Sequence, residues 1–279
     1  MLTSINNKAS VKSNKYPYAL FNFDQLNLAA PVVFFTGNNG SGKSTVLAAI
    51  ASLANAINLS GSDIDKFDYS QTLSLAFSLK LKAGYYLQAE DFYNFLSKAK
   101  LEQKEHQDLL DHTEARHDNK SGMGYLLESN LHKSNISAFK QIEDKYLNVS
   151  HGEGYINFFS DRLRANSLYL LDEPETPLSL DNQLSLIKLI DDAIKLGSQF
   201  VICTHSPILL AYPNAIIYDF SDNYAIVDYA DHYIVKDYQN FLSNSNRFMH
   251  HLLKWLEFLK EIILVLDFCL KFGYNSYVN

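Results

Sequence analysis

The residues with the clearest chemistry form a glycine-rich loop in the first part of the chain. The loop runs from Gly37 to Ser44 in the pattern G-x-x-x-x-G-K-S, between an apolar run at 32–36 and a helix-forming run at 46–51. In this context the glycines let backbone N–H groups turn toward phosphate oxygens, and the following helix presents its positive end. The lysine would reach the outer phosphates and the serine hydroxyl would ligate Mg²⁺. The sequence therefore predicts a nucleoside triphosphate site that contains Asn38, Asn39, Gly40, Ser41, Gly42, Lys43, Ser44 and Thr45.

Two carboxylates stand at the end of a second apolar run. The run 167–171 is typical of a parallel strand buried on both faces, and Asp172 and Glu173 follow it directly. A carboxylate at a strand end can hold Mg²⁺, and a second one beside it can orient or deprotonate an attacking water. Two prolines follow closely, which favours a rigid turn over the simpler interpretation of Glu173 as a polar loop residue. We therefore expect Asp172 to bind the metal and Glu173 to be catalytic.

A histidine follows the next apolar run. Residues 199–203 again favour a buried strand, and Thr204 and His205 come directly after it. A lone histidine is more often structural than functional, but one at a strand end beside a phosphate loop could sense the γ-phosphate. His205 is therefore the second predicted catalytic residue.

Other segments supply the elements that must position these residues. Residues 1–15 are polar, and we expect them to fray. Aromatic residues at 16–23 could stack on a nucleotide base or pack an edge strand. Apolar and polar residues alternate over 72–82, which predicts a half-buried antiparallel strand, and we expect 84–88 to pair with it. These patterns add an antiparallel β-subdomain near 72–90 to a mainly parallel sheet.

The segment 92–146 differs in composition from the rest of the chain. Charged and amide residues dominate it, with a glycine break near 122–124, which predicts a helical arm of two or three segments. It contains His106, His112 and His117, whose spacings do not bring them onto one helical face as metal ligands. We therefore expect a solvated face there rather than a metal site.

Composition narrows the classes of protein that fit. The chain has 279 residues, and a hydrophobic content of 47% is enough for a sizeable core. A net charge of −7 excludes an overall basic field that would hold nucleic acid non-specifically. Cys203 and Cys269 have apolar neighbours, which favours buried thiols over a disulfide. Without a secretory signal or an apolar stretch of membrane-spanning length, we expect no membrane span and a cytoplasmic location.

Together these motifs resemble those of the ABC-type ATPases. Residues 171–174, Leu-Asp-Glu-Pro, match the Walker B motif of that class, and His205 matches its switch histidine. Residues 149–153, Val-Ser-His-Gly-Glu, are similar to its signature Leu-Ser-Gly-Gly-Gln, and Ser150 and Gly152 fall on the matching positions. Residues 84–88 are similar to its Q-loop strand and place Gln88 at the glutamine.

The resemblance implies an α/β P-loop NTPase fold of the ABC-ATPase type, with a mainly parallel sheet, an antiparallel β-subdomain and a helical arm. It implies ATP and Mg²⁺ as cofactors, with Ser44, Asp172 and Gln88 around the metal. It also implies a head-to-tail homodimer formed on ATP binding. In that dimer Ser150 and Gly152 would contact the ATP held by the partner subunit.

Four segments together resemble small stand-alone bacterial ATPases that are grouped with the SMC and OLD-type proteins. They are residues 34–45, 150–153, 172–175 and 204–213. The implied ATPase domain covers 16–235, with the arm 92–146 inserted, and a helical extension covers 236–279. One departure is at the D-loop aspartate, which falls on Ser179 and leaves Ser179 and Asp181 as alternatives. The residues after 253 match nothing in the family.

Three functions are compatible with these features. The first is an ATP-hydrolysing switch coupled to a nucleic-acid-related or defence partner, which the SMC-like run 172–175 favours. The second is the ATP-binding subunit of a membrane transporter, which fits less well because Glu175 replaces the usual threonine. The third is a binding module without hydrolysis, and the presence of Glu173 argues against it.

The tail segment 250–272 is expected to form an amphipathic helix. Most of its charged residues gather on one arc at 100° per residue, and apolar residues cover a broad opposite side. Large apolar surfaces mark contact sites. Packing against the chain's own core, contact with a second copy or partner, and membrane association are the alternatives, in that order.

Overall fold

The computed structural model describes residues 1–8, 15–59, 61, 64, 67–79, 81–116, 122–254 and 260. The chain forms two compact units, Met1–Tyr229 and Ala230–Asn279. The domain boundaries expected from the sequence, at 16–235 and 236–279, stay predictions.

A seven-stranded sheet forms the centre of the first unit, with the strand order β10-β9-β3-β8-β7-β6-β4. All described pairs in it are parallel except β9 with β10. Every residue of the inner strands β3, β7 and β8 is buried, as expected when layers cover both faces of a parallel sheet. Their bounds are β3 Val32–Thr36, β4 Ile57–Asn58, β6 Ala83–Gln88, β7 Ser167–Asp172, β8 Gln199–Cys203, β9 Ile216–Asp219 and β10 Ala225–Ile226.

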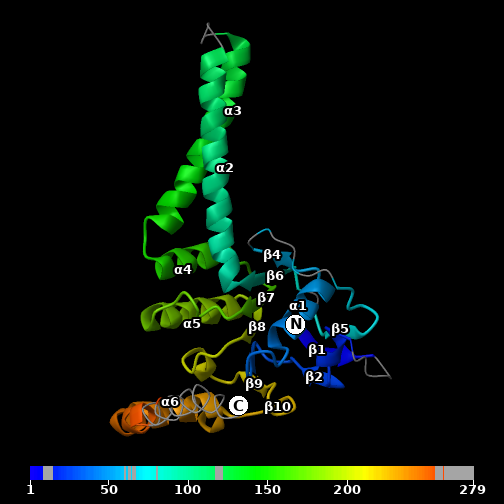
Figure 1. The fold of residues 1–279 in the computed structure, drawn as a ribbon. Coiled ribbons are helices and arrows are strands. Elements are labelled where there is room, and N and C mark those ends of the chain that lie inside the picture. Colours follow the sequence, from blue (N-terminus) through cyan, green and yellow to red (C-terminus); the bar gives the residue numbers. More distant parts are fainter. Residues whose placement is uncertain are drawn as a thin grey trace, which may run out of the picture. The chain divides into compact units, whose positions relative to one another are not determined.

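Helices cover this sheet. Apolar residues of α1 (Lys43–Leu53) share a buried cluster with residues of β3, β7 and β8. Helix α5 (Leu180–Lys195) follows the turn after β7 and lies on the other side of the sheet in Figure 1. Short helical turns complete the unit at η1 Tyr18–Leu20 and η3 Leu209–Ala211, and a third, η4 Tyr229–Asp231, spans the boundary between the two units in the sequence. The mixed α/β class with a mainly parallel sheet is confirmed.

A second sheet is antiparallel and has the order β2-β1-β5. Its strands are β1 Leu2–Asn7, β2 Gln25–Asn27 and β5 Leu73–Phe77. The expected fraying of the N-terminus is therefore wrong for residues 2–7, because Leu2 and Ile5 are fully buried in the core. Buried Gln199 joins this sheet to the first one, since its side chain accepts from the Leu2 N–H at 2.7 Å and donates to the Leu2 carbonyl at 2.9 Å.

The expected pairing of 84–88 with the 72–82 strand is also wrong. Strand β5 pairs with β1, whereas β6 joins the parallel sheet between β4 and β7. The physical reason is that Tyr86 and Leu87 point to opposite faces and are both buried, which an edge hairpin facing water would not allow. The parallel register then places Gln88 beside Asp172.

Two long helices form the arm, α2 (Ala89–Arg116) and α3 (Met123–Ile142), and lie alongside each other in Figure 1. A π-helical turn, η2 (Glu143–Leu147), leads into α4 (His151–Asp161). The arm begins three residues before the expected position 92, because α2 follows β6 without a loop. His106 faces His132 across the two helices, with Nδ1 atoms 3.1 Å apart. No group of three or more metal-binding side chains occurs among the described residues.

The second unit contains α6 (Tyr233–Ser243), followed by helical residues 245–254. Within α6, Ile234 and Val235 are the buried residues. In the described part of the chain, no helix has the length and apolar character needed to cross a bilayer. The amphipathic helix expected over 250–272 lies mostly outside the described residues.

Candidate nucleotide-binding site

The glycine-rich loop joins β3 to α1 with a backbone that requires its glycines. Gly37 has a φ of +130° and Gly42 a φ of +96°, values that residues with a side chain rarely adopt. A Cβ atom at Gly37 would also lie 2.9 Å from the Ser221 hydroxyl oxygen. The exposed tip of the loop is formed by Asn38, Asn39 and Gly40, and it is followed by half-buried Ser41. The loop is therefore shaped by backbone constraints and closely packed at its start.

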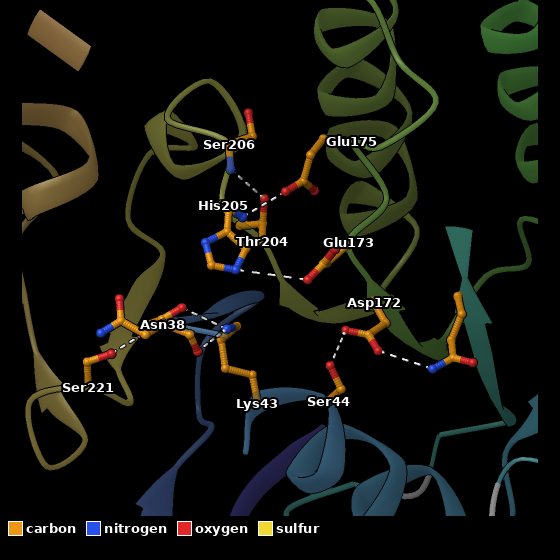
Figure 2. Close-up of polar contacts among 12 residues, drawn as sticks. Asn38, Lys43, Ser44, Asp172, Glu173, Glu175, Thr204, His205, Ser206 and Ser221 are labelled. Atoms are coloured by element: carbon orange, nitrogen blue, oxygen red, sulfur yellow. Dashed lines mark hydrogen bonds and ion pairs between the residues drawn. The ribbon is translucent and has the colours of Figure 1, made fainter. Parts of the chain in front are cut away.

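Lys43 is the buried cation of this loop. Its Nζ donates to the carbonyl oxygens of Gly37 at 2.7 Å and Asn38 at 3.0 Å (Figure 2). Burial lowers the pKa of the ammonium group, and the nearby Cys203, Glu173 and other acidic groups partly offset that effect. The ammonium group is thus held inside the loop, where the outer phosphates of a nucleotide are expected.

Ser221 supports the loop from outside and was not expected from the sequence. Its hydroxyl accepts a hydrogen bond from the Asn38 N–H at 2.7 Å, and its own N–H donates to the Asp219 carboxylate at 2.8 Å. Both residues follow or end β9, the strand next to β3. No motif marks Ser221, so only the strand order could have found it.

Asp172 brings the expected metal-binding residues together. One carboxylate oxygen accepts from the Ser44 hydroxyl at 3.0 Å, and the other accepts from the Gln88 amide nitrogen at 3.2 Å. Burial raises the pKa of this carboxyl, and these two hydrogen bonds partly offset the rise. Hydroxyl and carboxylate oxygens are the donors that Mg²⁺ prefers, so Ser44 and Asp172 fit the ion. Gln88 faces Asp172 with its nitrogen, and its amide oxygen would have to turn to act as a ligand.

Glu173 stands in a strained position one residue beyond β7. It has a φ of +47°, while its N–H still donates to the Cys203 carbonyl at 3.0 Å. Such strain persists only where the surrounding structure enforces it, and it concentrates at functional sites. The turn directs the Glu173 carboxylate toward the His205 ring, with 3.9 Å between Oε1 and Nε2 (Figure 2). Burial and then the Lys43 charge lower the pKa of His205, which favours the neutral imidazole.

Glu175 is an acidic residue of the site for which the sequence predicts no role. Its Oε1 accepts the backbone N–H of His205 at 2.7 Å, whereas its Oε2 is buried without a hydrogen-bond partner among the described residues. Burial raises the pKa of this carboxyl, partly offset by the His205 N–H. An acidic residue between two prolines, beside the expected catalytic residue Glu173, is the signal that could have marked it.

The signature-like residues lie at the start of α4. Ser150 caps this helix, and its hydroxyl and the Glu153 carboxylate form a reciprocal capping box. Gly152 packs closely within the chain, because a Cβ atom there would displace the Asn182 side chain and lie 3.2 Å from the Pro177 carbonyl oxygen. Within the residues that the structure describes, no hydrogen bond joins Ser150 to the glycine-rich loop. Ser179 caps α5 through one bond, with its hydroxyl accepting from the Asn182 N–H at 3.4 Å.

The carboxyl ends of β3, β7 and β8 thus bring together a buried ammonium group, a hydroxyl beside a carboxylate, and a carboxylate beside an imidazole. All expected residues of the glycine-rich loop, Asp172, Glu173, Gln88 and His205 meet at this edge of the sheet. Ser150 and Gly152 are held by α4 and α5 instead. The arrangement can bind a polyphosphate with its cation and activate a water beside it.

A family model and two solved structures match parts of the chain. A solved metal-chelate type ABC transporter in an inward-facing conformation is similar at 19% identity, covering 75% of this chain and 77% of its own, with a TM-score of 0.37. The SMC head domain from Thermotoga maritima is similar at 12% identity, also with a TM-score of 0.37. The match covers 78% of this chain and 94% of that domain. TM-scores this low support no conclusion, and no curated protein matches the chain.

The family model described as ABC transporter matches residues 27–176, more than half of the chain. The chain therefore belongs to the ABC transporter family of ATPases.

Proposed function

We propose that this protein hydrolyses ATP with Mg²⁺ at the carboxyl edge of its parallel sheet. The observation that carries the proposal is the convergence of Lys43, the Ser44–Asp172 pair and the Glu173–His205 pair at that edge. A protein that consumes ATP in this way fits the cytoplasmic location expected from the sequence.

Each side chain has a role that follows from its surroundings. Lys43 would exchange its two loop carbonyls for phosphate oxygens, since charge-assisted hydrogen bonds to phosphate are stronger than those to neutral carbonyls. Ser44 and Asp172 would hold the Mg²⁺, which neutralises charge on the transferred phosphoryl group when bound. Glu173 would accept a proton from the attacking water or orient it. A neutral His205 would donate a hydrogen bond to the γ-phosphate while its ring stays near the Glu173 carboxylate.

Replacement of the proposed base tests the reaction. Glu173→Gln keeps the shape of the side chain and removes its basicity, so turnover should fall by about 10²-fold or more. ATP binding should survive, because Lys43 and the loop are unchanged. Phosphate release measures the first quantity and equilibrium binding of ATP the second. Unchanged turnover would remove Glu173 from the mechanism.

We further propose that the active form is a head-to-tail homodimer. Ser150 is exposed at the positive N-terminus of α4, where it could meet an anion from a second subunit. In the Glu173→Gln background, ATP and Mg²⁺ should produce a dimer by light scattering, and Ser150→Arg should abolish it. A monomer at high protein concentration with saturating ATP and Mg²⁺ would contradict this form of the proposal.

The partner of the ATPase is a separate proposal. We favour a soluble protein or nucleic-acid-related partner, with a transporter permease as the second candidate because the matched family is described as ABC transporter. Capture with the Glu173→Gln protein in the presence of ATP distinguishes them. Recovery of an integral membrane protein would favour the transporter, and recovery of nucleic acid or a soluble protein would favour the switch.

A further inference from the structure

The Glu175 carboxyl ties together two segments of the nucleotide site. Its Oε1 accepts the His205 N–H at 2.7 Å, which links the turn after β7 to the loop after β8 (Figure 2). Its Oε2 is buried and has no hydrogen-bond partner in the described ranges of the chain. A buried carboxyl oxygen without a partner lowers stability, and such groups in native structures require a physical reason.

The same turn contains a second unfavourable feature, the positive φ of Glu173. Strained backbone and half-satisfied polar groups persist where function requires them. Only one residue separates the two features in the chain. This coincidence points to a role of the turn in the chemistry and not in stability.

The imidazole of His205 has few contacts of its own that could fix its position. Its Nε2 is buried, lacks a hydrogen-bond partner among the residues described, and lies 3.9 Å from Glu173 Oε1, too far for a hydrogen bond. The position of the ring therefore depends on how the backbone of residues 204–206 is anchored.

That backbone has two anchors on the α5 side. Glu175 holds the His205 N–H, and the Ser206 hydroxyl donates to Gln183 Oε1 at 2.6 Å. The Ser206 hydroxyl in turn accepts the N–H groups of Ile208 and Leu209, so it also fixes the start of η3. Glu175 is thus the anchor that acts directly at the histidine.

We propose that Glu175 is a positioning residue, which fixes His205 at the distance from Glu173 that hydrolysis requires. The inference rests on the proposed ATPase function and adds to it a residue that acts through His205.

A purely structural role is the competing hypothesis. The Tyr155 hydroxyl of α4 is also buried without a hydrogen-bond partner in the part of the chain that is described, and the charge of Glu175 acts on it. Glu175 could therefore matter through the interior that it shares with α4. The two hypotheses differ in what a second mutation at His205 would do.

The test is a double-mutant cycle on the full-length protein, with kcat and KM for ATP measured under saturating Mg²⁺. Glu175→Ala should lower kcat roughly tenfold, the size expected for loss of a hydrogen bond to a charged group, with KM changed less than about threefold. Glu175→Gln keeps an oxygen that can accept the His205 N–H and should retain most of the turnover. In a His205→Ala background, adding Glu175→Ala should cost no further activity, because both changes remove the same function.

Additive losses in the double variant, or equal losses in Glu175→Ala and Glu175→Gln, would overturn the proposal. Tyr155→Phe removes the buried hydroxyl and leaves the His205 bond intact, so it should stay within about twofold of wild type. Asp192→Ala, at an exposed residue of α5, is the surface control. Should Glu175→Ala fail to fold, Glu175→Gln can be compared with unchanged Glu175, both in the His205→Ala background. A loss of turnover on adding Glu175→Gln there would contradict the proposal.

The two proposals fail in different ways. If Glu173→Gln is inactive while Glu175→Ala has normal kcat, the ATPase proposal stands and the positioning role is wrong. If Glu173→Gln hydrolyses ATP normally, the proposed mechanism itself is wrong.

Discussion

The nucleotide site and the helical arm of the same unit are held together in opposite ways. At the site, partners come from distant parts of the sequence, as when the Ser44 hydroxyl meets Asp172, and the groups are largely buried. In the arm, α2 packs on its sequence neighbour α3, and Arg116 pairs with Glu128 at an exposed position. The arm also leaves Met123, Leu127 and Leu131 exposed along one side of α3. The site is thus fixed by the sheet, and the arm by local helix formation, by buried residues of α2 and α3 such as Leu110 and Tyr125, and by surface contacts.

The arm returns to the rest of the unit where the π-helical turn η2 approaches α4. A Cβ atom at Gly154 would overlap the Tyr146 carbonyl oxygen. The Tyr146 hydroxyl donates to the Asp161 carboxylate at 2.6 Å, which fixes the other end of α4. This junction resembles the site in its close packing, and substitutions there should behave like those in a core.

The largest expected effect is at the site. Lys43→Ala removes a buried ammonium group that is placed for phosphate, and ATP affinity should fall by about 10- to 100-fold, the loss of one or two charge-assisted hydrogen bonds. Titration with a fluorescent ATP analogue measures it. Lys188→Ala, at an exposed lysine of α5, should leave the affinity unchanged. Equal affinities in wild type and Lys43→Ala would show that the loop does not bind the phosphates.

The junction should give the next largest effect, this time on stability. Gly154→Ala forces a methyl group against a backbone carbonyl and should lower the free energy of unfolding by about 1–3 kcal/mol. Gly124→Ala is the matched control in the arm, because nothing lies within 4 Å of its Cβ position among the described residues. Alanine also favours a helix over glycine there, so this variant should be neutral or more stable by up to about 1 kcal/mol. Similar thermal unfolding of the two variants would contradict the close approach of η2 to α4.

The smallest effect is expected at the exposed ion pair of the arm. Arg116→Ala should lower the free energy of unfolding by at most about 1 kcal/mol, because water and salt screen exposed charges. Denaturant unfolding at low and high salt measures it, and the difference from wild type should shrink at high salt. ATP turnover should not change. A loss of turnover in Arg116→Ala would mean that the arm and the site are less separate than the contacts indicate.

The contrast between site and arm also accounts for what the sequence could predict. The convergence of the glycine-rich loop, Asp172 and His205 at one edge of the sheet is predictable because each ends or follows an apolar run, and the carboxyl ends of neighbouring parallel strands lie at the same edge. The buried strands are predictable because a short, continuous apolar run at such a position is typical of a strand covered on both faces. Helices α2 and α3 follow from composition, but not their neighbours in space, since an exposed helix surface records little about its contacts.

The wrong expectations have a common physical cause, which is that strand partners are chosen by burial over the whole fold. The run 83–88 joins the parallel sheet because Tyr86 and Leu87 can both be buried there. The polar N-terminus forms β1 because it pairs with β2 and β5 and buries Leu2 and Ile5, and Gln199 from a distant strand also bonds to the Leu2 backbone. The contacts of Glu175 and Ser221 could not be predicted for the same reason, since each residue meets a segment that only the fold brings near.

The most direct test of the central claim is the release of phosphate from ATP by the purified wild-type protein as the Mg²⁺ concentration is varied. We predict saturable hydrolysis that disappears when the cation is chelated and returns when Mg²⁺ is added back, because in our proposal Ser44 and Asp172, which are hydrogen-bonded to each other, hold the ion. Hydrolysis at the same rate in excess chelator, or none at saturating ATP and Mg²⁺, would contradict it.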